Sequence, residues 1–154
     1  MHADRCATIS DMNALIGPLE QQLLLVIALS VVIGLVIGIE RELRGKDAGI
    51  STHILVIAGA ALFALLSNTF ETSSTHPIAA GVVTGIGFLG AGLILKDGGP
   101  EAHVRNLTTA ASLWFAGAIG IALGFGLYTL AIIGGLACAL IPLIPSIRRT
   151  DTPS

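Results

Sequence analysis

Charged residues are scarce in this chain of 154 residues: Asp, Glu, Lys and Arg make up 12% of it, about half of the share that is usual in a soluble domain. The formal net charge is only −2, so no basic surface is available for nucleic-acid phosphates. Hydrophobic residues reach 53% and the mean hydropathy is +0.86, more apolar surface than a short soluble chain can bury. The composition therefore excludes a soluble enzyme domain, a disordered chain and a nucleic-acid-binding protein, and it predicts an integral membrane protein surrounded by the lipid bilayer.

Cysteine is scarce as well. Cys6 stands in a polar segment and Cys138 in an apolar run, which excludes a disulfide-stabilised scaffold. Residues 1–22 contain four charged residues and lack an apolar core of the length found in a signal peptide. We therefore expect residues 1–22 to form an extracytoplasmic tail of the mature protein.

Uncharged segments alternate with charged loops along the rest of the chain. A helix needs about 20 apolar residues to cross a bilayer, and the last uncharged run has room for two helices with a turn at Gly124–Gly126. We expect an all-α fold, a polytopic membrane helix bundle of five transmembrane helices over residues 23–147, followed by a cytoplasmic tail, 148–154. The expected spans are 23–39, 50–70, 78–95, 107–124 and 127–147.

The basic residues indicate the orientation of this bundle, because cytoplasmic loops carry an excess of Lys and Arg. Seven of the eight lie on alternate loops. These are Arg41, Arg44, Lys46, Lys96, Arg105, Arg148 and Arg149. With an odd number of spans, this bias predicts an N-terminus outside the cell and a C-terminus in the cytoplasm.

Glycine is abundant, with 19 residues, and many of them recur at helical spacing. Small residues at this spacing let helices approach closely in lipid. The candidate packing glycines are Gly34, Gly38, Gly81, Gly85, Gly87, Gly90 and Gly92. Because segment 78–95 is small on two faces, we expect it at the centre of the bundle. The surplus of small faces also predicts association with a second copy or with another membrane protein, through a glycine face such as Gly34–Gly38.

The densest cluster of charge follows the first span and includes Glu40, Arg41, Lys46 and Asp47. Two interpretations are open. If the helix continues past the membrane, Glu40 can pair with Arg44 four residues later, and the cluster is a self-neutralising helix end. Alternatively, Glu40 and Asp47 face the bundle and bind a divalent cation, which prefers oxygen ligands.

Thr52 and His53 begin the second span. A histidine can titrate near neutral pH or bind a transition metal. No second His or Cys stands at ligand spacing, because His76 lies at the opposite end of the span. A hydrogen-bonded His53 at the membrane interface is therefore favoured over a metal ligand.

Thr108 and Thr109 open the fourth span, after Asp97 and Arg105 in the preceding loop. Their hydroxyls can hydrogen-bond to a neighbouring helix or to the backbone; alternatively they form a polar constriction with Asp97 and Arg105 at its cytoplasmic mouth. The sequence offers neither a Ser-His-Asp arrangement on one side of the membrane nor a phosphate-binding glycine loop with its Lys. We therefore expect no enzyme activity.

Three motifs in the same order resemble signatures of the MgtC/SapB family, over about residues 20–145. They are Gly-Ile-Glu-Arg-Glu at 38–42 with Lys-Asp-Ala-Gly-Ile-Ser-Thr-His at 46–53, the glycine-rich segment 85–94, and Val-Arg-Asn-Leu-Thr-Thr-Ala-Ala at 104–111 followed by Trp114 and Ala116. The family usually has Arg where Ser51 stands and Gly where Asn106 stands, and many members continue into a C-terminal cytosolic domain.

The resemblance implies a multi-pass protein of the bacterial inner membrane that is linked to magnesium limitation, acid tolerance and virulence. Two modes of action stay open. Such a protein binds other membrane proteins, among them the F-type ATP synthase, or it transports Mg²⁺, in which case Glu40, Asp47 and Asp97 are the candidate ligands; no other cofactor is expected. We favour the binding role because no acidic residue lies deep in any expected span.

Overall fold

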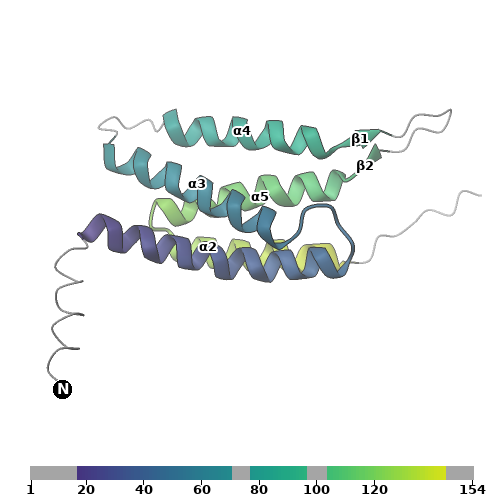
Figure 1. Cartoon of the computed structure of the whole chain (residues 1–154), viewed down its shortest axis with the longest axis horizontal. Coiled ribbons are helices and arrows are strands. Elements are labelled where there is room, and N and C mark those ends of the chain that lie inside the picture. Colours follow the sequence, from purple (N-terminus) through teal and green to yellow (C-terminus); the bar gives the residue numbers. More distant parts are fainter. Residues whose placement is uncertain (1–16, 71–76, 97–103, 145–154) are drawn as a thin grey trace, which may run out of the picture.

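The computed structural model describes residues 17–70, 77–96 and 104–144, and its long elements are five α-helices (Figure 1). A short antiparallel pair of strands, in which Leu95 pairs with Arg105, connects the third of these helices to the fourth. The elements are α2 (Pro18–Leu43), α3 (Ile50–Phe70), α4 (Pro77–Leu93), β1 (Leu95–Lys96), β2 (Val104–Arg105), α5 (Leu107–Gly124), α6 (Tyr128–Leu140) and the 3₁₀ turn η1 (Ile141–Leu143).

The helices have the apolar composition and surface of membrane spans, and three of them have the length. Among the described residues, α2, α3 and α5 are long and apolar enough to cross a bilayer, and α4 and the segment Tyr128–Leu143 are shorter apolar helices. Large apolar side chains point away from the bundle, such as Leu55, which is 71% exposed, and Phe88, which is 81% exposed. A surface of this kind is stable only in a lipid environment, so the chain is a multi-pass, all-α membrane protein.

Two glycines end helices, Gly126 at the predicted turn and Gly45 in the charged loop after the first expected span. Gly45 and Gly126 have positive φ angles of 62° and 76°, a conformation that costs glycine little. The amide of Lys46 donates to Arg41 O and that of Leu127 donates to Ala122 O, which are the six-to-one hydrogen bonds of the Schellman motif. These caps end α2 and α5 and set the short connections to α3 and α6.

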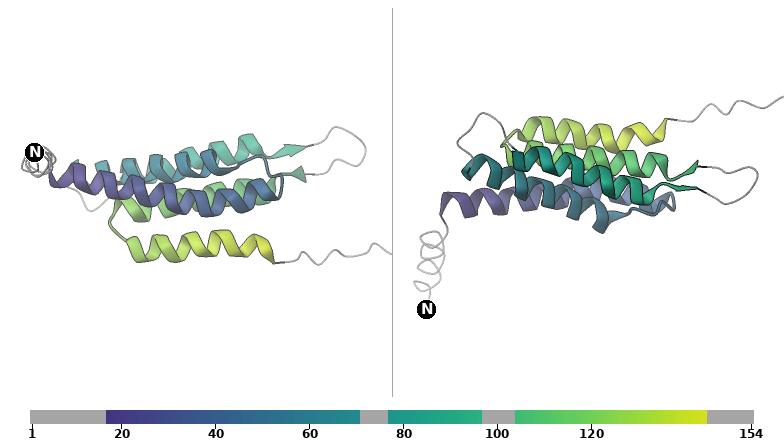
Figure 2. Two further views of the ribbon diagram at one scale, coloured as in Figure 1. Left: turned by 60° about the horizontal axis from the view of Figure 1, so that its bottom comes forward. Right: turned by 90° about the horizontal axis from the view of Figure 1, so that it is seen from above.

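Helix α5 lies at the centre of the bundle, and the expectation that segment 78–95 would be central is wrong. Ten residues of α5 are buried, against three of α4. Helix α5 packs against α2, α3, α4 and α6, whereas α4 packs against α3 and α5 at one side (Figure 2).

The glycines explain this arrangement. A β-carbon at Gly120 or Gly124 would overlap the backbone of α3, so these glycines bring α5 and α3 into close contact. Gly34 and Gly38 do the same for α2, against Ile54 and Ile50 of α3; they face the interior and are not an external association surface. By contrast, four glycines of α4 have nothing within 4 Å of an added β-carbon: Gly81, Gly85, Gly87 and Gly92. Gly90 alone among the candidate glycines of α4 contacts a neighbour, at Ala110 of α5.

The helix bounds differ from the predicted spans at several ends. Helix α2 extends beyond 23–39 in both directions, and its last turn carries the charged residues Glu40–Glu42. The third helix ends at Leu93 because Leu95 and Lys96 leave it to form β1. The fifth ends at Leu140 and continues as η1, which contains Pro142. Helices α3 and α5 have the predicted bounds.

Candidate functional site

A buried polar network joins α2, α3 and α5 at the end of the bundle where α2 finishes. At its centre is Arg41, which is 1% exposed and donates from Nη2 to Thr109 Oγ1 over 2.8 Å. The inward-facing residues of α2 lead to this position at helical spacing, through Gly34 and Ile37. A charge inside a protein requires hydrogen-bond partners, and Thr109, itself fully buried, supplies one of them.

His53 of α3 belongs to the same network and is fully buried. Its Nδ1 lies 2.8 Å from Gly49 O and its Nε2 lies 3.3 Å from Ser112 Oγ. Since a carbonyl oxygen only accepts, Nδ1 carries a proton and donates to Gly49 O. Ser112 Oγ is also 2.8 Å from Thr109 O, so this hydroxyl connects the histidine to the residue that binds Arg41.

The carboxylates next to this network bind groups of the protein itself. Glu40 Oε1 forms an ion pair with Arg44 Nε at 2.6 Å, as the pairing interpretation predicted. Arg44 Nη1 also donates to Pro142 O over 2.7 Å, which links α2 to η1. Glu42 Oε1 accepts from the backbone amide of Ile50 over 3.0 Å and so caps the start of α3.

Asp47 and Asn106 connect the two charged segments that the sequence singled out, one before α3 and one before α5. Asn106 Nδ2 donates to Asp47 Oδ2. Asn106 has a φ of 63°, a left-handed conformation that Asn adopts more readily than most residues. This angle gives a physical reason for the glycine that the family usually has here.

The remaining described candidates are less buried than Arg41, His53 and Thr109. Thr52 is half-buried, whereas Lys46, Arg105 and Thr108 are exposed. Asp97, the third candidate Mg²⁺ ligand, lies outside the described residues.

The positions of the carboxylates show how well this end of the bundle could bind a cation. The described part of the chain contains no group of three or more His, Cys, Asp and Glu side chains that could hold a metal ion. Glu40 Oε2 is buried and has no hydrogen-bond partner among the described residues, but it stands beside the guanidinium of Arg44. Positive charge so near repels a cation, so these residues fit Mg²⁺ poorly.

Two cavities of about 550 Å³ each open on the bundle. The first is a polar cavity at the network, where Arg41, Arg44, Lys46, Thr108 and Ser112 contribute the polar part of the lining and Phe115 and η1 contribute apolar surface.

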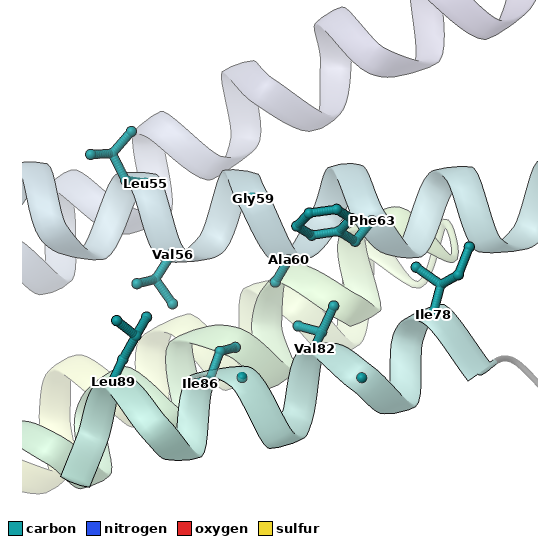
Figure 3. Close-up of a pocket in the computed structure, with 11 residues that line it drawn as sticks. Leu55, Val56, Gly59, Ala60, Phe63, Ile78, Val82, Ile86 and Leu89 are labelled. Atoms are coloured by element: carbon teal, nitrogen blue, oxygen red, sulfur yellow. The ribbon is translucent and has the colours of Figure 1, made fainter. Parts of the chain in front are cut away.

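The second cavity is an apolar groove between α3 and α4 (Figure 3). Gly59 of α3 faces it together with Gly81 and Gly85 of α4. The side chains of Phe63, Val82 and others form the rest of its wall. We call it the α3–α4 groove.

Sequence reasoning identified Arg41 only as a member of a charged loop and missed its place in the interior. The signal was present, since the small and apolar positions of α2 continue at a spacing of three or four residues to Arg41. Nothing in the sequence indicated that Cys138 Sγ would lie 3.9 Å from Ser112 O, because that contact depends on the packing of α6 against α5.

The fold and the buried network define a polytopic α-helical membrane protein whose polar groups gather at one end of the bundle. The model of the MgtC family matches residues 27–147, and the chain belongs to this family.

Similar proteins come from several bacteria. Protein MgtC of Salmonella typhimurium (strain LT2) is 41% identical over 124 residues, which are 79% of this chain and 52% of the relative. "Putative magnesium transporter YhiD" of Escherichia coli (strain K12) is 42% identical over 114 residues, which are 68% of this chain and 52% of the relative. The uncharacterized protein slr0014 of Synechocystis is 44% identical over 114 residues, 73% of this chain and 47% of the relative.

This chain thus spans about half the length of the curated relatives that it matches. No solved structure matches it.

Proposed function

We propose that this protein acts in magnesium homeostasis at the bacterial inner membrane by binding another membrane protein, and that it neither catalyses a reaction nor carries Mg²⁺ itself. In this proposal the N-terminus is outside and the polar network is at the cytoplasmic side, as the basic loops indicate. The paired segments around Glu40–Asp47 and Arg105–Thr109 stabilise the cytoplasmic end of the bundle. In this proposal the same two segments also form a docking surface for the partner at the cytoplasmic end of the bundle.

The observation that carries the proposal is the α3–α4 groove. Its glycines leave backbone accessible from the membrane, and nothing within the described chain covers Gly59, Gly81 or Gly85. Helices associate in lipid through such small-residue surfaces, since the hydrophobic effect does not drive them together there. A helix of a partner membrane protein, packed against α4, would supply the missing contacts; for the cellular partner the resemblance suggests the F-type ATP synthase.

The alternative, transport of Mg²⁺, is favoured by the name of the Escherichia coli relative. It requires a path with ligands through the bundle. Helices α3, α4, α5 and α6 contain no Asp or Glu, and Glu40 and Asp47 are bound to Arg44 and Asn106. Mg²⁺ usually needs one or two carboxylates in addition to its waters, so the binding role has the stronger physical support.

A flux measurement separates the two functions. The purified chain is reconstituted alone into liposomes that contain a Mg²⁺-sensitive dye, and protein-free liposomes serve as the control. We expect no Mg²⁺ entry above the control. Entry that falls in Glu40→Gln would overturn the binding role and establish transport.

Crosslinking in inner membranes tests the groove itself. Gly85→Leu fills the α3–α4 groove, whereas Gly87→Leu makes the same change on the same helix outside it, and both glycines have open space around them. We expect Gly85→Leu to reduce crosslinks to the partner about tenfold or more, which is a loss of about 1.4 kcal/mol, and Gly87→Leu to preserve them. Crosslinks that survive in Gly85→Leu would contradict docking in the groove. If the chain crosslinks only to a second copy of itself, the partner is not another membrane protein and the groove is the interface of a homo-oligomer.

A further inference from the structure

The polar cavity has an imbalance of charge. Among the described residues, Arg41, Arg44 and Lys46 line it and no acidic residue does. Glu40 offsets the charge of Arg44 through their ion pair. Arg41 has no carboxylate within ion-pair distance among the described residues, and the bond from its Nη2 goes to a neutral hydroxyl.

Arg41 is also incompletely hydrogen-bonded. Its Nε is buried and has no hydrogen-bond partner within the described part of the chain. An arginine that is 1% exposed and lacks a counter-ion is costly, because a buried charge requires pairing to offset the loss of water. Thr108 lines the same cavity, and its hydroxyl is a polar group that can donate a hydrogen bond.

We propose that the polar cavity binds a phosphate-bearing anion, with Arg41 and Lys46 as the principal cationic contacts and Thr108 as a hydroxyl donor. Guanidinium groups bind phosphate oxygens with charge-assisted hydrogen bonds, and ammonium groups bind them as point charges. Such an anion supplies the missing negative charge for Arg41. This site is separate from the α3–α4 groove, although Lys46 and Thr108 also belong to the docking segments of the proposed function.

The lining suggests the shape of the ligand. Phe115, Ile141, Leu143 and Ile144 form an apolar wall beside the three basic residues. A phosphate group that carries an acyl chain, as in an anionic phospholipid of the cytoplasmic leaflet, would satisfy both parts. Free phosphate would satisfy the basic part alone, and the two sources differ in their dependence on lipid.

The test measures thermal unfolding of the full chain in neutral detergent micelles with three additives in turn: dioleoylphosphatidylglycerol, dioleoylphosphatidylcholine and inorganic phosphate. Stabilisation by phosphatidylglycerol alone would identify a lipid headgroup, and stabilisation by inorganic phosphate would identify a free anion. If neither stabilises the protein more than phosphatidylcholine does, the proposal is overturned.

Variants locate the site. Arg41→Gln removes the buried cation; because this variant could fail to fold, Lys46→Gln, which changes an exposed residue, provides an independent measurement. We expect Lys46→Gln to weaken binding about fivefold, which corresponds to about 1 kcal/mol for one basic residue at an anionic membrane surface. Equal affinity in Lys46→Gln and the wild type would refute this placement of the anion.

Discussion

Helices α4 and α5 have similar compositions and opposite positions in the bundle. Both are apolar and rich in glycine and alanine at helical spacing. Gly120 and Gly124 of α5 lie against the backbone of α3, whereas most glycines of α4 face open space. The comparison teaches that a small-residue pattern marks a surface suited to close packing but does not say whether the chain itself or another molecule occupies that surface.

The largest effect on the free energy of unfolding is expected when the same Gly→Leu substitution is made in α5 and, for comparison, in α4. Gly120→Leu should prevent the approach of α5 to α3, because even a β-carbon there overlaps the carbonyl oxygen of Ile57. We expect a loss of about 3 kcal/mol or more in the free energy of unfolding, at the upper end of what overpacking costs. Gly87→Leu, in open space on α4, should change it by less than about 0.5 kcal/mol. Unfolding in detergent, followed by circular dichroism, measures both; equal losses would show that α4 and α5 are packed alike.

Two adjacent threonines of α5 allow a buried position to be compared with an exposed one on the same helix. Thr109→Val leaves Arg41 Nη2 without its acceptor and should destabilise the protein by about 1.5–3 kcal/mol, the usual range for a hydrogen bond to a charged group. Thr108→Val changes an exposed position and should cost less than about 0.5 kcal/mol. The same unfolding measurement compares the pair, and a stable Thr109→Val would mean that Arg41 does not depend on this hydroxyl.

The smallest effects are expected at the start of α5, where Asn106 joins it to the loop before α3. Asn106→Leu loses the hydrogen bond to Asp47 and places a branched side chain at a φ of 63°, for which we expect a cost of about 1–2 kcal/mol. Asn106→Gly loses the bond but fits the angle, so its cost should be under about 1 kcal/mol. If the two variants are equally stable in thermal unfolding, the backbone conformation does not limit the choice of residue at this position.

Much of the local structure could be predicted from the sequence. The bounds of α3 follow from the charged and polar residues at both of its ends. The start of α5 follows from the charged loop before it, and the turn after α5 follows from the glycines at Gly124–Gly126. The pairing of Glu40 with Arg44 follows from their spacing on one helix. These features depend on residues that are close in the chain, where spacing decides which side chains can meet.

The candidate site could be predicted only in part. The sequence identified the segments around Arg41 and Thr109 but did not indicate that these two side chains meet 68 positions apart. It also offered Glu40 and Asp47 as cation ligands, whereas the structure gives each of them a partner within the chain. The contacts of Arg41 with Thr109 and of Asp47 with Asn106 depend on how α2, α3 and α5 pack together, which no local pattern specifies.

The sequence by itself determined that this chain is a helical membrane protein of the MgtC family, because hydropathy, charged loops and family motifs are properties of contiguous residues. Only the tertiary structure decided that α5 is central, that the glycines of α4 are open and that Arg41 binds Thr109. The physical reason is that lipid is as apolar as the interior of the bundle. The hydrophobic pattern therefore does not distinguish the inside of this protein from its outside. Which helix faces are buried is decided by the packing of small residues and the pairing of polar groups.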